Sequence, residues 1–111
     1  VATNDSEAAA RSHLRHFGIE GMFDYIAGYD SGHGAKPDPG MCTAFARSCR
    51  VPADQVIMVG DSLHDLHAGR EAGMQTVAVL TGVAVAKDLW DHADVVLPDI
   101  SHLQAWISGR G

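Results

Sequence analysis

The stretch Val56-Ile57-Met58-Val59-Gly60-Asp61-Ser62-Leu63-His64-Asp65 decides how this chain is expected to fold. Its first four residues are apolar and three of them are β-branched, which is typical of a buried strand. A glycine ends the run, and a helical pattern follows from Ser62 until Gly73 stops it. Ligands of open α/β sheets bind beyond the carboxyl ends of the strands, so Asp61 is a candidate functional residue. Asp65, one helical turn later, is expected on the same side.

Two carboxylates this close to one another resist ionising together unless a cation lies between them. Hard oxygen ligands suit Mg²⁺, which usually takes one or two protein carboxylates and completes its shell with water and phosphate. Asp61 and Asp65 are therefore predicted to be metal ligands, and Mg²⁺ is the predicted cofactor.

Composition limits the class of protein. A chain of 111 residues suffices for one small domain, and 46% hydrophobic with 20% charged residues is ordinary for a globular protein. The net charge of −6, without any basic run, argues against nucleic acid. No apolar stretch is long enough to cross a bilayer, and no leader pattern opens the chain. Neither a nucleic acid nor a membrane partner is expected.

Cysteine and histidine usage gives two further expectations. Cys42 and Cys49 fall on one predicted helix, where their Cα atoms would be about 10 Å apart, too far for a mutual disulfide. Reduced thiols favour a cytoplasmic location. His64 and His67 share a helix face without an accompanying zinc-binding pattern, so they are interpreted as solvent-facing.

The rest of the chain alternates between predicted helices and strands. Asp5 or Ser6 caps a helix with apolar positions at Ala10, Leu14 and Phe17, which Gly18 ends. The expected strands after it are Tyr25–Tyr29, Thr76–Leu80 and Ala93–Leu97. This alternation predicts a parallel, doubly wound α/β sheet.

Three further helices are expected between and after these strands. Asp38 is the expected cap of the first, with Pro39 at its first helical position and a buried stripe of Cys42, Phe45, Ala46 and Cys49. A short helix is expected around Ala86 to Asp91. Ser101 is the expected cap of the last, which carries Leu103, Ala105, Trp106 and Ile107.

Two other segments carry candidate functional residues. Thr3 and Asn4 precede the first helix, a position where such residues commonly act as caps. Lys36 opens the distinctive loop Lys36-Pro37-Asp38-Pro39, where a lysine is otherwise expected to face solvent. A phosphate-binding P-loop is excluded here, because the spacing is wrong, Pro37 lacks an N–H donor and Asp38 would repel phosphate.

Together these segments resemble the haloacid dehalogenase (HAD) superfamily of phosphohydrolases. Gly60-Asp61-x-x-x-Asp65 followed by Ala-Gly-x-x-Ala-Gly-Met resembles its fourth motif, Lys36 its third, and Thr3-Asn4 its second. The resemblance implies catalytic roles for Thr3, Lys36 and Asp61, and phosphoryl binding by Thr3, Asn4 and Lys36. It also implies a HAD-like, Rossmann-type three-layer sandwich. Val-Gly-Asp-Ser is most similar to phosphoglycolate-phosphatase-like members.

The family's first motif, Asp-x-Asp on a central strand, is absent from the sequence. By resemblance, residues 1–111 are then the carboxyl-terminal part of a core domain, without its first strand or a cap domain. The expected function is Mg²⁺-dependent hydrolysis of a small phosphorylated metabolite through an aspartyl-phosphate, whose nucleophile lies outside this chain, so that the chain alone is expected to be inactive. A phosphomutase, a phosphonate hydrolase and a non-catalytic metal-binding or interaction module remain alternatives. Substrate and oligomeric state are not readable from the sequence.

Overall fold

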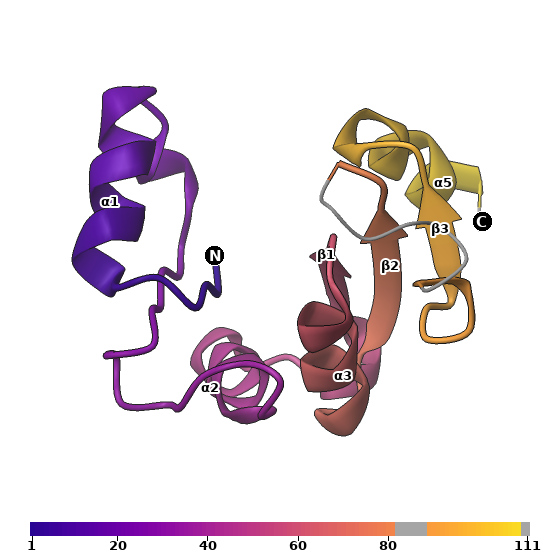
Figure 1. The fold of residues 1–111 in the computed structure, drawn as a ribbon, viewed down its shortest axis with the longest axis horizontal. Coiled ribbons are helices and arrows are strands. Elements are labelled where there is room, and N and C mark those ends of the chain that lie inside the picture. The colour runs from indigo at the N-terminus through magenta and orange to yellow at the C-terminus, as the bar shows by residue number, and fades with distance from the viewer. Residues whose placement is uncertain (82–88, 110–111) are drawn as a thin grey trace.

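A three-stranded parallel sheet organises the carboxyl-terminal half of the chain (Figure 1). The computed structural model describes residues 1–81 and 89–109. The strands β1 (Ile57–Gly60), β2 (Gln75–Val79) and β3 (Val95–Leu97) lie in the order β1-β2-β3, each parallel to its neighbour. All three fall where the apolar runs predict them, so the expected parallel α/β architecture is confirmed.

The β1–α3–β2 unit follows directly from its sequence. Helix α3 (Leu63–Glu71) connects the two strands, and Gly73 leaves it with a positive φ of 85°, the conformation expected of a terminating glycine. Gly69 lets the helix approach the sheet, because a Cβ there would lie 2.5 Å from the Cβ of Met58. On the same face, Leu66 packs with Ala78 of β2 in a fully buried cluster.

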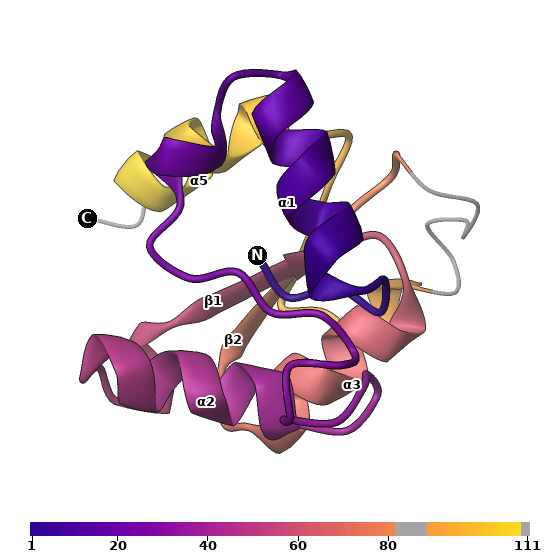
Figure 2. The same ribbon diagram turned by 90° about the vertical axis from the view of Figure 1, so that its left-hand side faces the viewer.

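Helix α2 (Gly40–Cys49) lies beside α3 on one side of the sheet, and α5 (Leu103–Gly109) lies on the other (Figures 1 and 2). Cys42 and Ala46 are buried in a cluster with Ala68 and Met74. Two expectations about α2 are wrong. Pro39 is itself the N-cap and no side chain caps the helix, and Cys49 is exposed because it lies in the last turn, beyond the packed part of the helix.

Helix α1 (Glu7–His16) begins at Ser6, whose hydroxyl accepts a hydrogen bond from the Ala9 N–H at 3.1 Å. A 3-10 turn, η1 (Glu20–Met22), follows it. The expectation that Phe17 lies on the buried face is wrong. Phe17 is the C-cap residue and is 73% exposed, because the helix has ended before the apolar pattern repeats a third time.

The expected strand over Tyr25–Tyr29 is reduced to a single parallel bridge between Ala2 and Ala27. Three hydrogen bonds support it, from the Val1 nitrogen to the Tyr25 carbonyl, from Ala27 N–H to Val1, and from Thr3 N–H to Ala27. This bridge is separate from the three-stranded sheet, so the described residues form no continuous sheet from the N-terminal segment to β1.

The C-terminal part closes the fold. A 3-10 turn, η2 (Ala53–Gln55), precedes β1, and another, η3 (Ile100–His102), leads into α5. The expected cap of the last helix is wrong: Ser101 lies inside η3, which runs directly into α5, and Asp99 is the N-cap of that turn, its carboxylate accepting from the Ser101 N–H at 2.8 Å. Residues 86–88 of the helix expected around Ala86 to Asp91 lie outside the described residues.

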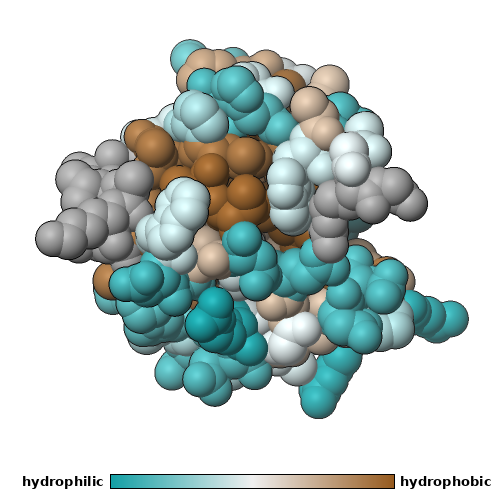
Figure 3. Space-filling view, turned by 90° about the vertical axis from the view of Figure 1, so that its right-hand side faces the viewer, coloured by the Kyte–Doolittle hydropathy of each residue, from teal (hydrophilic) through white to brown (hydrophobic). Residues whose placement is uncertain are grey.

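The face that carries β3 has a hydrophobic area surrounded by hydrophilic side chains (Figure 3). β3 is the last strand in the order, and its three residues are only half-buried. The exposed side chains near this end of the chain include Trp90, Ile100 and Ile107. Across the described part of the chain, no helix is long and apolar enough to cross a membrane.

Candidate active site

The turn from β1 into α3 fixes the orientation of Asp65. Ser62, the N-cap of α3, accepts a hydrogen bond from the Asp65 N–H at 3.4 Å and donates its hydroxyl to Asp65 Oδ2 at 3.1 Å. The Asp61 N–H donates to the same oxygen at 3.2 Å. A carboxylate in the first turn of a helix is also stabilised by the helix dipole. Asp65 therefore turns back toward Asp61, as the spacing predicts.

Gly60 makes this arrangement possible. A Cβ on Gly60 would lie 2.2 Å from the Cβ of Asp65 and 2.4 Å from its Oδ2, closer than non-bonded atoms approach. Any side chain at this position would therefore push the Asp65 carboxylate away from the end of β1. From the sequence, Gly60 is interpreted only as the end of a strand. Its position directly before Asp61, in the motif that also contains Asp65, is the signal that could have indicated a close contact with Asp65.

Lys36 binds Asp65 from the loop that precedes α2. The Lys36 ammonium donates to Asp65 Oδ1 in an ion pair whose side chains are 11% and 10% exposed. Both oxygens of the Asp65 carboxylate are thus engaged, one by the lysine and the other by the turn. Lys36 and Asp65 lie 29 positions apart in the chain, and the sequence motifs placed both in one site. In the structure they are in direct contact.

Asn4 brings the N-terminal segment to the same loop. Its Oδ1 accepts a hydrogen bond from the Lys36 N–H at 2.8 Å, and its Nδ2 donates to the Lys36 carbonyl at 3.0 Å. Thr3, the preceding residue, accepts from the Asp5 N–H at 3.1 Å through its Oγ1, which leaves the hydroxyl proton of Thr3 available to a ligand. The three predicted segments are therefore joined by continuous contacts.

The Asp61 carboxylate differs from that of Asp65. It is partly buried, and among residues 1–81 and 89–109 it has no hydrogen-bond or ion-pair partner. The same residues contain no cluster of three His, Cys, Asp or Glu side chains that could hold a metal. Mg²⁺ needs only one or two protein carboxylates, so the carboxylates of Asp61 and Asp65 have the chemistry that would suit that ion.

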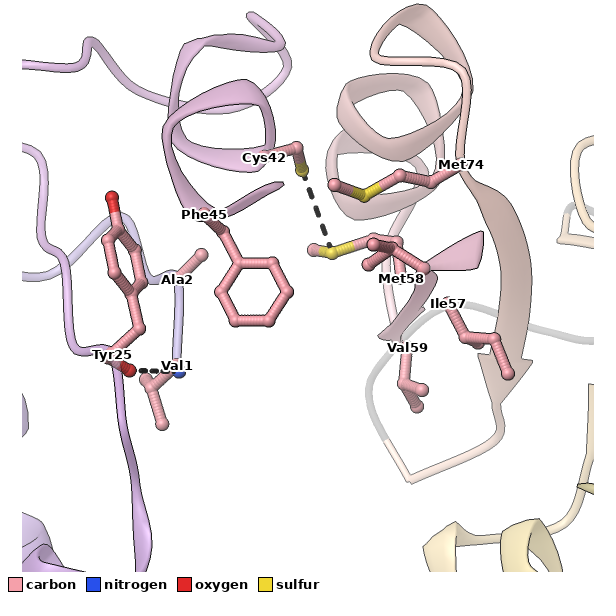
Figure 4. A pocket seen from close by; sticks show the side chains of 10 residues that line it. Val1, Ala2, Tyr25, Cys42, Phe45, Ile57, Met58, Val59 and Met74 are labelled. Carbon is pink, nitrogen blue, oxygen red and sulfur yellow. Dashed lines mark hydrogen bonds between the residues drawn. The ribbon is translucent and has the colours of Figure 1, made fainter. Parts of the chain in front are cut away.

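A cavity of about 210 Å³, here called the channel, separates the N-terminal segment from β1 (Figure 4). One side is formed by Val1, Ala2 and Tyr25 and the other by Val56 to Val59, with Cys42, Phe45 and Met74 completing the lining. The Phe45 ring points into the space between the two sides (Figure 4). Burial raises the pKa of the Cys42 thiol, so this side chain contributes another neutral surface.

Within residues 1–81 and 89–109, β1 pairs with β2 along one edge and has no partner along the other. Its other edge faces the channel, and the strand carries neither a charge nor a proline that would protect a free edge. An apolar channel beside an open strand edge has the chemistry to accept another extended segment.

Sequence comparison with known proteins matches the part of the chain that contains this site. The family model described as haloacid dehalogenase-like hydrolase matches residues 1–79, which contain all the site residues. The chain belongs to this family. A phosphoglycolate phosphatase from Rhodospirillum rubrum is 33% identical over 107 residues, which are 96% of this chain and 44% of the relative. Tyrosine-protein kinase PtkA from Mycobacterium tuberculosis is 42% identical over 81 residues, which are 71% of this chain and 27% of that protein.

Solved structures confirm the HAD fold. A HAD family hydrolase from Deinococcus radiodurans, solved with bound phosphate and sodium, superposes with a TM-score of 0.88 at 22% identity, over 97% of this chain and 50% of that one. The resemblance stated from the motifs is therefore confirmed. This HAD chain spans less than half the length of the curated relatives named above.

Proposed function

We propose that the complete protein is a Mg²⁺-dependent phosphomonoesterase that acts on small phosphorylated metabolites through an aspartyl-phosphate. The observation that supports this most is the continuous contact from Asn4 through Lys36 to Asp65 and Asp61, at the carboxyl end of β1. Those contacts link the segment that carries the Thr3 hydroxyl, the Lys36 ammonium and the turn that carries Asp61, and phosphoryl transfer needs a hydroxyl, an ammonium and a carboxylate of this kind.

Each side chain has a role that follows from its contacts. The Lys36 ammonium, fixed by Asp65, offsets the negative charge of the transferring phosphoryl group. The Thr3 hydroxyl and the unused N–H of the Asn4 amide donate to phosphoryl oxygens. Asp61, whose carboxylate is free, holds the cation. When bound, Mg²⁺ supplies charge stabilisation at the equatorial phosphoryl oxygens.

The nucleophile is proposed to come from outside residues 1–111, on an extended segment that fills the channel. The open edge of β1 supplies backbone partners for such a strand, and the apolar lining supplies its side-chain contacts. A parallel strand in the channel would end between Thr3 and Asp61. Residues 1–111 are accordingly expected to be inactive by themselves.

The test is a screen of small phosphate esters with the complete protein, with and without Mg²⁺. Asp61→Asn is expected to abolish Mg²⁺-dependent phosphate release and to leave the circular dichroism spectrum unchanged, because its side chain makes no contact that supports the fold. Asp24→Asn, on an exposed turn, is the matched control and should retain activity. Unchanged turnover in Asp61→Asn would refute the metal assignment.

The similarity to a protein named as a tyrosine kinase favours one alternative. A phosphoryl acceptor other than water would turn the same site into a phosphotransferase. Incubating the complete protein with ATP distinguishes the two, because a hydrolase releases inorganic phosphate while a kinase leaves phosphotyrosine on protein. A phosphomutase would convert an ester in the screen to an isomeric phosphate ester without releasing phosphate, and a phosphonate hydrolase would leave the esters untouched and release phosphate only from added phosphonates.

A further inference from the structure

Asp65 fixes the ammonium end of the Lys36 side chain. The main chain of Lys36 needs a separate anchor. Lys36 lies in an irregular loop, in neither a helix nor a strand. Among the described residues, its N–H and carbonyl make no hydrogen bond to other backbone groups. A lysine has four rotatable side-chain bonds, so an unanchored main chain would leave its charge poorly placed.

Asn4 supplies that anchor. Its side-chain amide pairs with both backbone groups of Lys36, at 2.8 Å to the N–H and 3.0 Å to the carbonyl, across 32 positions of sequence. An amide is suited to this task because it carries a donor and an acceptor side by side. Aspartate would lose the donor, and alanine would lose both bonds.

The segment that carries Asn4 is itself held in place. The Thr3 N–H donates to the Ala27 carbonyl at 3.0 Å, and the Tyr29 N–H donates to the Asp5 carbonyl at 3.0 Å. Asn4 therefore extends from a backbone that is pinned on both sides. Movement of this segment would be transmitted to Lys36 through two hydrogen bonds.

We propose that Asn4, besides the phosphoryl contact proposed above, has a second role as a positioning residue that sets the location of the Lys36 ammonium relative to the transferring phosphoryl group. This inference rests on the proposed function for its catalytic consequence, but its structural part does not. Asn4 and Asp65 hold opposite ends of one lysine, so the distance from the N-terminal segment to α3 is fixed through that side chain.

The test combines a structural and a kinetic measurement on the complete protein. In Asn4→Ala, backbone amide exchange at Lys36 is expected to accelerate about tenfold, since a hydrogen bond to that N–H is lost. In Asn4→Asp, which keeps the acceptor, the Lys36 amide should stay protected. With the phosphate ester found in the screen, kcat of Asn4→Ala is expected to fall about 10-fold to 100-fold with KM changed much less.

Gln75→Ala is the matched control, because Gln75 also donates a side-chain amide bond to a distant carbonyl, that of Asp54 at 3.1 Å, away from the site. It should change neither measurement. Unchanged Lys36 exchange in Asn4→Ala overturns the inference, as does lost protection with wild-type kcat. If the wild-type protein releases no phosphate while Asn4→Ala still loses Lys36 protection, the proposed function fails and the anchoring of Lys36 by Asn4 stands.

Discussion

Removing one partner of the Lys36–Asp65 ion pair is expected to destabilise the protein far more than removing an ion pair from its surface. The two side chains are 11% and 10% exposed, so a lone charge left behind cannot regain its hydration. Breaking a buried pair in this way typically costs about 3–5 kcal/mol. For Lys36→Met we expect about 3 kcal/mol, the lower end of that range. The Asp65 carboxylate would still accept hydrogen bonds from the Asp61 N–H and the Ser62 hydroxyl.

Asp65→Asn is expected to cost a similar amount, because it strands the lysine ammonium beside a neutral amide. The double variant Lys36→Met/Asp65→Asn leaves no unpaired charge. Its loss is therefore expected to be about 2 kcal/mol, well below the roughly 6 kcal/mol that two independent losses would give.

The assay is urea unfolding of the complete protein, with the free energy of unfolding taken by linear extrapolation. Arg11→Met is the matched control, since the Arg11–Glu7 pair is 41% and 38% exposed on α1 and solvent screening should leave it little effect on stability. If Lys36→Met costs no more than Arg11→Met, or if the single losses simply add, the pair is not buried as described and the reasoning fails.

Two further predictions concern the turn and the cysteines. Gly60→Ala is expected to lower the free energy of unfolding by about 1–3 kcal/mol and to impair phosphate release, because the new Cβ would overlap Asp65; wild-type values for both would show that the turn adapts freely. Iodoacetamide at about pH 8 should modify exposed Cys49 well before Cys42, which is 2% exposed and has a pKa raised by burial. The Cys42 rate should therefore keep rising with pH above the ordinary pKa of a free thiol, and both cysteines should react alike in urea. Equal rates in the folded protein would contradict this burial.

Sequence patterns predicted the parts of the fold that local chemistry controls. The apolar run before Asp61 became β1, and Ser62 capped the next helix. The three parallel strands follow from the alternation of strands and helices along the chain, and local sequence patterns determine that alternation. The motifs placed Asn4, Lys36 and Asp65 in one site, and the structure joins them through side-chain contacts to Lys36 rather than through strands of one sheet.

The features that were predicted wrongly or missed depend on backbone conformation and on contacts between distant residues. A local sequence pattern does not contain that information. Tyr25–Tyr29 has the composition of a strand but makes only one bridge, because extended backbone needs a neighbour along its whole length. Asp99 and Ser101 are both good caps, and only the backbone conformation selects Asp99. The bonds between Asn4 and Lys36 cross 32 residues and involve main-chain groups that every residue has, so no side-chain pattern could indicate them.

The open edge of β1 also has a consequence for handling the protein. Ile57 to Val59 present apolar side chains and unpaired backbone groups without the charges or prolines that discourage aggregation. If an extended segment fills the channel in the complete protein, as proposed above, its removal would expose a template onto which strands of neighbouring molecules can be added. Such a loss would be seen as precipitation that depends on protein concentration, so solubility would report whether the channel is filled.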